Sequence, residues 1–204
     1  MVGEIRQTAK PGRAEEAAGH AERAVSLLEE GDAPGAAREA ERAKSLAPRS
    51  AALREILALA YYADERWREA LREMQAYRRM SGRLDENHVI ADSHRALGQA
   101  SRAIEDVERA LDDADVPDEV KAECAVVGAS AFADMGRFDE ALGLLRRVRA
   151  TAGVGRPSDL RVWYVTGDVL VRLGRREEAA HEFLRILQHD PTAFDAADRL
   201  AALR

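Results

Sequence analysis

The sequence predicts an all-α fold, built from about five consecutive helical hairpins and one further helix. Large apolar residues recur three and four positions apart along most of the chain, which is the spacing of a buried helical stripe. Glycine or proline interrupts these stripes at intervals, where helices end. The chain is rich in alanine and only 5% aromatic. This composition favours closely packed helices over β-sheets, whose strands prefer β-branched and aromatic residues.

The two ends of the chain differ from the regular pattern. Residues 1–16 are expected to form an N-terminal segment or cap that ends near Pro11-Gly12, a strong helix-breaking pair. Residues 192–204 carry apolar residues three apart and are expected to form a C-terminal capping helix. A terminal helix with a polar outer face keeps an open stack of hairpins soluble. The inner stripe of this last helix is predicted to comprise Phe194, Ala197, Leu200 and Leu203.

Between these ends, each hairpin has the same plan: a helix, a turn that usually contains glycine, and a second helix with a small residue near its start. Ser50 and Ser158 are expected to cap the first helices that follow them. The second hairpin has Glu65 where the others have a turn glycine. The expected hairpins span residues 17–50, 51–83, 84–121, 122–159 and 160–191.

The small residue of each second helix sets the period of the repeat. These residues are Ala36, Ala70, Ala103, Ala141 and Ala179, at spacings of 34, 33, 38 and 38. A helix-turn-helix unit with a period near 34 resembles the tetratricopeptide repeat (TPR). The resemblance implies a right-handed α-α superhelix, or solenoid. The segments YRRMSGR, NHVIADSHRALG and RVWYVTGDVL also resemble a group of uncharacterised actinobacterial TPR proteins.

The TPR resemblance implies that side chains from the first helices line a concave groove. This groove is expected to bind a peptide or a partner helix, with apolar contacts in the amino-terminal part and polar contacts further along. Leu59 could instead pack only against a neighbouring repeat. The lysine and asparagine that bind chaperone tails in one TPR subclass are replaced here by Ala21 and Val25. The predicted groove residues are Glu55, Leu59, Tyr62, His88, Asp92, Arg95, Tyr164 and Asp168.

No pattern of residues requires catalysis, a cofactor or a metal. His88 and Asp92 lie one helical turn apart, but a zinc site needs three or four ligands. The chain lacks the glycine-rich phosphate loop and the nucleophile and metalloprotease motifs. Its single cysteine, Cys124, excludes an intramolecular disulfide and is expected to be a packed core residue. We therefore predict a non-enzymatic protein.

Charge and hydropathy limit the partners. The net charge is −6, which argues against nucleic acid as the default partner. No apolar run is long enough to span a membrane, and the expected location is the cytoplasm. The leading hypothesis is a protein-interaction scaffold or adaptor. The alternatives are self-association, including a homodimer, through the first hairpin or the edge at Trp67, and RNA or ribosome association through Arg146-Arg147 and Arg149.

Overall fold

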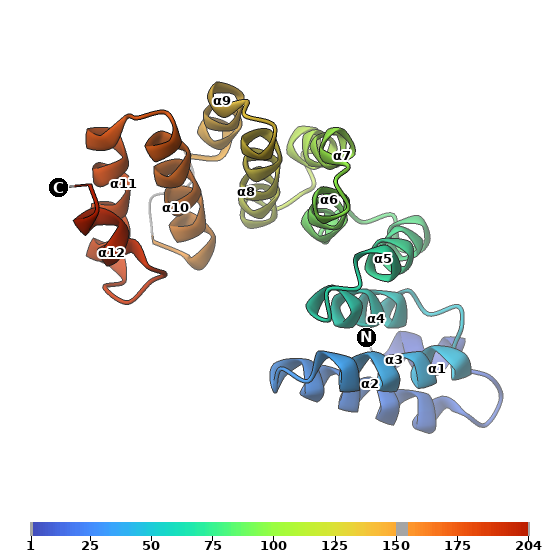
Figure 1. Cartoon of the computed structure of the whole chain (residues 1–204). Helices are drawn as coiled ribbons and strands as arrows, with labels where there is room; N and C mark the ends of the chain where they lie inside the picture. Colours follow the sequence, from blue (N-terminus) through green and yellow to red (C-terminus); the bar gives the residue numbers. More distant parts are fainter. Residues whose placement is uncertain (1, 150–154, 204) are drawn as a thin grey trace. The chain divides into compact units, whose positions relative to one another are not determined.

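The computed structural model describes residues 2–149 and 155–203 (Figure 1). All regular secondary structure in these two ranges is helical, so the predicted all-α class is confirmed. The helices are α1 Val2–Thr8, α2 Ala14–Glu29, α3 Ala33–Leu46, α4 Ala51–Ala63, α5 Trp67–Ser81, α6 Asn87–Ala96, α7 Ala100–Asp112, α8 Asp118–Asp134, α9 Phe138–Arg149, α10 Pro157–Arg172, α11 Arg176–His189 and α12 Ala196–Ala201.

The chain forms two compact units, Met1–Leu97 and Gly98–Arg204. In the first unit, α2 packs on α3 and α4 on α5, and the first helices α2, α4 and α6 contact one another in sequence. In the second unit, α8 packs on α9 and α10 on α11, and α8 also contacts α10. The unit boundary falls in the turn of the third expected hairpin, and the borders between repeats stay a prediction.

The turns within the hairpins need a residue with positive φ. Gly31, Gly136 and Gly174 have φ of 83°, 73° and 74°, a region that glycine enters without a Cβ clash. Glu65 occupies the corresponding turn of α4–α5 with φ of 56°. The backbone therefore keeps the same turn where the sequence departs from glycine.

The two expected serine caps have different outcomes. The Ser50 hydroxyl accepts a 3.2 Å hydrogen bond from the backbone N–H of Leu53, so this cap of α4 is confirmed. The prediction for Ser158 is wrong, because α10 begins at Pro157 and Ser158 is buried inside its first turn. Asp159 instead accepts a 3.1 Å hydrogen bond from the backbone N–H of Arg156.

The amino-terminal segment forms a short packed helix, α1. Ile5 is fully buried among residues of α2, α3 and α4. The Glu4 carboxylate accepts hydrogen bonds of 2.7 and 3.1 Å from the backbone N–H groups of Ala51 and Ala52. These N–H groups have no partner within α4, so α1 completes the cap that Ser50 begins.

The carboxyl-terminal helix is shorter than expected. It covers only Ala196–Ala201, and its buried residue is Ala196. Phe194 has φ of 55° and is 51% exposed, which places it in the turn before α12. The predicted apolar stripe is therefore wrong in part, because Phe194 lies in a turn before the helix starts and both Phe194 and Ala197 are exposed.

Candidate functional site

The first unit contains an open groove of about 470 Å³ beside helix α4. Its apolar wall includes Val25 of α2 together with Ile56 and Leu59 of α4. Glu4 and Glu55 contribute carboxylates, and Tyr77, Ser81 and Arg83 line the side formed by the end of α5 and the residues after it. The groove therefore combines apolar surface with a mostly acidic set of charged groups.

Glu55 is one of two predicted groove residues that line this surface, together with Leu59. It is half-buried and forms no hydrogen bond or ion pair with any residue in the described ranges. Burial raises the pKa of its carboxyl, and the negative charge of Asp85 raises it further. Leu59, one helical turn later, lines the same groove and is half-buried against the core of α4, α5 and α6. Leu59 thus both lines the groove and packs against neighbouring helices, and its contact with a partner stays a prediction.

Three more charged groups stand close to Glu55. Asp85 accepts hydrogen bonds of 3.0 and 3.2 Å from the Tyr77 hydroxyl and pairs with Arg83. Burial raises the pKa of Glu86 to about 7, and the charges of Glu55 and Asp85 act in the same direction. Glu55, Asp85 and Glu86 thus repel one another electrostatically on the side of the groove next to the start of α6.

A second group of predicted residues is hydrogen-bonded together further along α4 and α6. The Tyr62 hydroxyl donates to Asp92 Oδ2 at 2.6 Å, and Arg95 Nε donates to Asp92 Oδ1 at 2.8 Å. Trp67 packs edge-on against the Tyr62 ring with centroids 5.3 Å apart, and it is half-buried. His88 Nε2 lies 3.8 Å from Glu86 Oε2. The structure therefore joins α4 to α6 through side chains predicted for the groove.

The two predicted residues of the second unit contact the end of the chain. The Tyr164 hydroxyl donates to Asp195 Oδ1 at 2.6 Å, and its ring lies 4.9 Å from that of Phe194. Asp168 pairs with Arg199 of α12 and, at 3.1 Å, with Arg172. Both side chains are half-buried. Their polar groups, predicted to contact a partner, bond instead to residues of the segment around α12.

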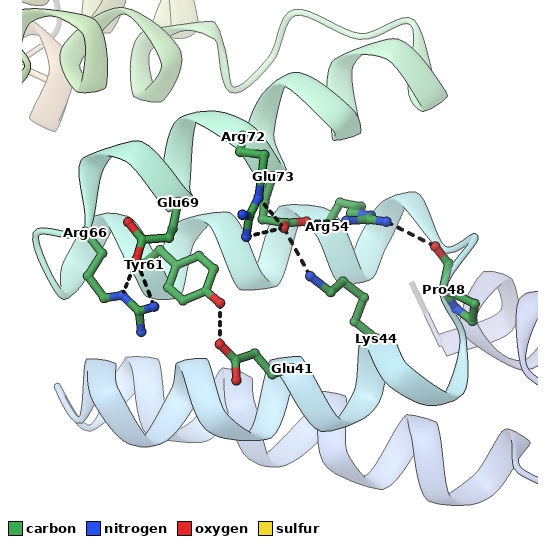
Figure 2. A network of polar contacts seen from close by, with 9 residues as sticks. All are labelled: Glu41, Lys44, Pro48, Arg54, Tyr61, Arg66, Glu69, Arg72 and Glu73. Carbon is green, nitrogen blue, oxygen red and sulfur yellow. Dashed lines mark hydrogen bonds and ion pairs between the residues drawn. The ribbon is translucent and has the colours of Figure 1, made fainter.

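The sequence analysis missed the carboxylate of Glu73, which is 1% exposed on α5 (Figure 2). It accepts hydrogen bonds from Lys44 of α3 at 3.1 Å and from Arg72 at 3.2 Å, and a further one from Arg54 of α4. Burial raises the pKa of Glu73, but the hydrogen bonds from Arg54 and Lys44 outweigh it and hold the pKa below its usual value. Nearby, Tyr61 of α4 donates a hydrogen bond to Glu41 of α3 (Figure 2).

A sequence signal for this feature exists. The residue three positions after the small alanine of each second helix faces the same side of the helix. It is acidic in four of the five hairpins: Glu39, Glu73, Asp106 and Glu182. All four carboxylates are buried or nearly so, with the Glu39 side chain 14% exposed. The fourth hairpin has Leu144 at this position.

Other candidate chemistry finds no support in the described ranges. No group of three or more His, Cys, Asp or Glu side chains there could hold a metal ion. Cys124 is buried, as expected for a core residue. Arg147 pairs with Glu108 and Asp112 of α7, so this part of the expected arginine cluster is neutralised. The side chain of Arg149 lies outside the described residues. Each helix of residues 2–149 and 155–203 is too short or too polar to cross a lipid bilayer.

Comparison with protein families supports the repeat assignment over part of the chain. Residues 127–201 match the family model of the tetratricopeptide repeat. A comparison with curated protein sequences finds no match. The resemblance to actinobacterial TPR proteins stays a prediction.

Several solved structures have a similar fold. TTC0263, a thermophilic TPR protein of Thermus thermophilus, has a TM-score of 0.71 at 18% identity, with 92% of this chain and 98% of that chain covered. The apo form of the quorum sensor NprR from B. thuringiensis has a TM-score of 0.78 at 15% identity, covering 99% and 61%. YrrB, described as a TPR protein with an unusual peptide-binding site, has a TM-score of 0.58 at 18% identity, covering 88% and 89%. At these identities the likeness shows a TPR-type fold.

Proposed function

We propose that this protein is a non-catalytic interaction scaffold that binds a peptide or a helix of a partner protein in the groove beside α4. The observation that carries this proposal is the open groove of about 470 Å³, which combines the apolar surface of Val25, Ile56 and Leu59 with the carboxylate of Glu55, which is bonded to no residue in the described ranges. Concave sites with mostly apolar walls and a few polar groups are typical binding sites. The similar fold of YrrB, a TPR protein with an unusual peptide-binding site, supports this proposal.

The hydrogen-bonded group of Tyr62, Asp92 and Arg95 supports a positioning role next to the groove. Tyr62 and Asp92 fix α4 relative to α6 through a 2.6 Å hydrogen bond, so the groove wall needs little ordering when a partner binds. Preorganised surfaces bind more tightly because less conformational entropy is lost. In the second unit, Tyr164 and Asp168 contact residues 194–199, and we propose a stabilising role for them.

Site-specific crosslinking in cells of the source organism tests the proposal. A photoreactive residue in place of Leu59, in the groove, should crosslink a partner protein. The same residue in place of Leu184, which is 43% exposed on α11, is the matched control and should not capture that partner. The substitution Leu59→Arg should abolish co-purification of the partner and leave the helical circular-dichroism spectrum unchanged. Equal capture from both positions would contradict the groove assignment. Crosslinked dimers of the chain itself would favour self-association.

A further inference from the structure

The charges around the groove distinguish between classes of peptide. Glu4, Glu55, Asp85 and Glu86 lie in or beside it, and Arg83 is the cation among the residues that line it. Arg83 is already paired with Asp85, and Glu4 is held by the backbone of α4. Glu55 is the acidic group that has no partner in the described part of the chain. An acidic peptide would place like charges together here, which costs binding free energy.

The apolar surface sets the second requirement. Val25, Ile56 and Leu59 form one wall of the groove, and Glu55 precedes Leu59 by one helical turn on the same face of α4. A lysine or arginine side chain matches this arrangement, because its aliphatic stem can cover apolar surface while its charged end reaches a carboxylate.

From this arrangement we infer that the occupant of the groove is a peptide segment carrying a lysine or arginine next to a large aliphatic residue. The basic group pairs with Glu55, and the aliphatic side chain packs on Val25 and Leu59, which are partly exposed in the groove. The inference rests on the proposed function, because it specifies the ligand of the same groove.

The ionisation of the groove gives this occupant a characteristic pH dependence. The charges that act on Glu55 are those of Glu4 and the amino terminus, and of Arg83 and Asp85 between α5 and α6. Tyr77 of α5 and Glu86 also interact with its carboxylate. The pKa of Glu86 is raised to about 7, and that of Glu55 is raised as well. As the pH falls through about 7, the carboxylate of Glu86 becomes neutral, and part of the attraction for a cation is lost. A basic peptide should therefore bind more weakly at about pH 6 than at about pH 8.

Selection from a library tests the inference without knowledge of the natural partner. Phage-displayed random dodecapeptides are selected against the full chain after depletion on the Leu59→Arg variant. Enriched peptides should carry lysine or arginine next to leucine, isoleucine or valine. Their affinity should fall about fivefold to tenfold in Glu55→Gln. Glu55→Gln removes a partly buried charge that has no partner, so it should fold normally. Glu105→Gln, an exposed residue of α7 with the same change in charge, is the matched control and should bind like the wild type.

The outcomes separate the two proposals. Enriched peptides that are acidic or uncharged, or whose affinity is equal in Glu55→Gln and the wild type, would overturn the inference and leave the groove as a binding site. An affinity that does not decrease between about pH 8 and about pH 6 would count against it in the same way. A selection in which no peptide distinguishes the wild type from Leu59→Arg would overturn both the groove assignment and the inference.

Discussion

The second and fourth hairpins pack their helices with opposite chemistry at the same repeat position. In the second, Glu73 is buried and bonded to Lys44 and Arg54. In the fourth, Leu144 is 4% exposed at the corresponding position of α9. The places that correspond to Lys44 and Arg54 hold Leu111 and Ala125. A buried charge and its partners have therefore been exchanged together for apolar residues.

The facing helix differs in the same way. Leu57 of α4 corresponds to Gly128 of α8. A Cβ atom added to Gly128 would lie 2.5 Å from Leu144 Cδ2 and 2.9 Å from Val107 Cγ1. The fourth hairpin therefore has room for Leu144 because the facing residue, Gly128, has no side chain. The two hairpins thus share the path of their helices but not the contacts that hold the helices together. Those contacts depend on groups of residues that must change together.

The substitution Leu144→Glu should have the largest effect on stability. It places a carboxylate in a buried site where the basic partners of Glu73 have no counterpart, and a buried unpaired charge is costly. We expect a loss of about 4 kcal/mol in the free energy of unfolding, measured by urea denaturation. Leu144→Met should cost less than about 1.5 kcal/mol. A Leu144→Glu protein of wild-type stability would contradict the assigned difference between the hairpins.

The substitution Glu73→Gln should cost about 2 kcal/mol at neutral pH, because Lys44 and Arg54 lose their charged partner but still reach solvent in part. The pKa of Glu73 is lowered in the folded state. Its contribution is therefore present above the pKa of the unfolded chain and is lost as the pH falls through the folded value. Urea denaturation across a pH series should show the difference between the two proteins shrinking below about pH 4. The exposed control Glu105→Gln should show no such trend.

The substitution Gly128→Ala should have the smallest net effect. The added Cβ displaces Leu144 and Val107, which costs about 1–3 kcal/mol, while alanine gains about 1 kcal/mol of helix propensity over glycine. We expect net destabilisation by thermal unfolding. Gly143→Ala in α9 is the matched control, since its nearest atom would be Arg146 Nη2 at 4.0 Å. This control should be stabilised. Stabilisation of both variants would show that the contact at Gly128 is loose.

Much of the fold follows from the sequence because helical spacing and turn residues are local signals. Leu53, Leu57 and Tyr61 recur four positions apart in the sequence, and all three are buried on α4, as this helical spacing predicts. The burial of Glu73 was not predicted, because a charged residue is normally expected to be exposed. The signal appears only when the residue three positions after the small alanine is compared between the repeats. The path of the chain at Phe194 depends on a positive φ that an aromatic residue rarely adopts, so apolar spacing could not reveal it.

The candidate site was harder to predict from the sequence. The TPR resemblance implied groove positions for Glu55 and Leu59, and both residues line the open groove beside α4. The neighbouring carboxylates Asp85 and Glu86 belong to the segment before α6, whose position depends on tertiary packing. The pairing of Tyr164 with Asp195 likewise joins residues far apart in the sequence, and no periodicity within one helix indicates it.

Glu4 connects the groove to the local unfolding of α4. The same carboxylate lines the groove and accepts hydrogen bonds from the first N–H groups of that helix. Detachment of α1 would therefore break these hydrogen bonds and remove part of the groove wall. A ligand that binds only when this wall is in place shifts that opening equilibrium by mass action. Amide protons in the first turn of α4 should therefore exchange more slowly with deuterium as ligand is added, which makes them a reporter of occupancy.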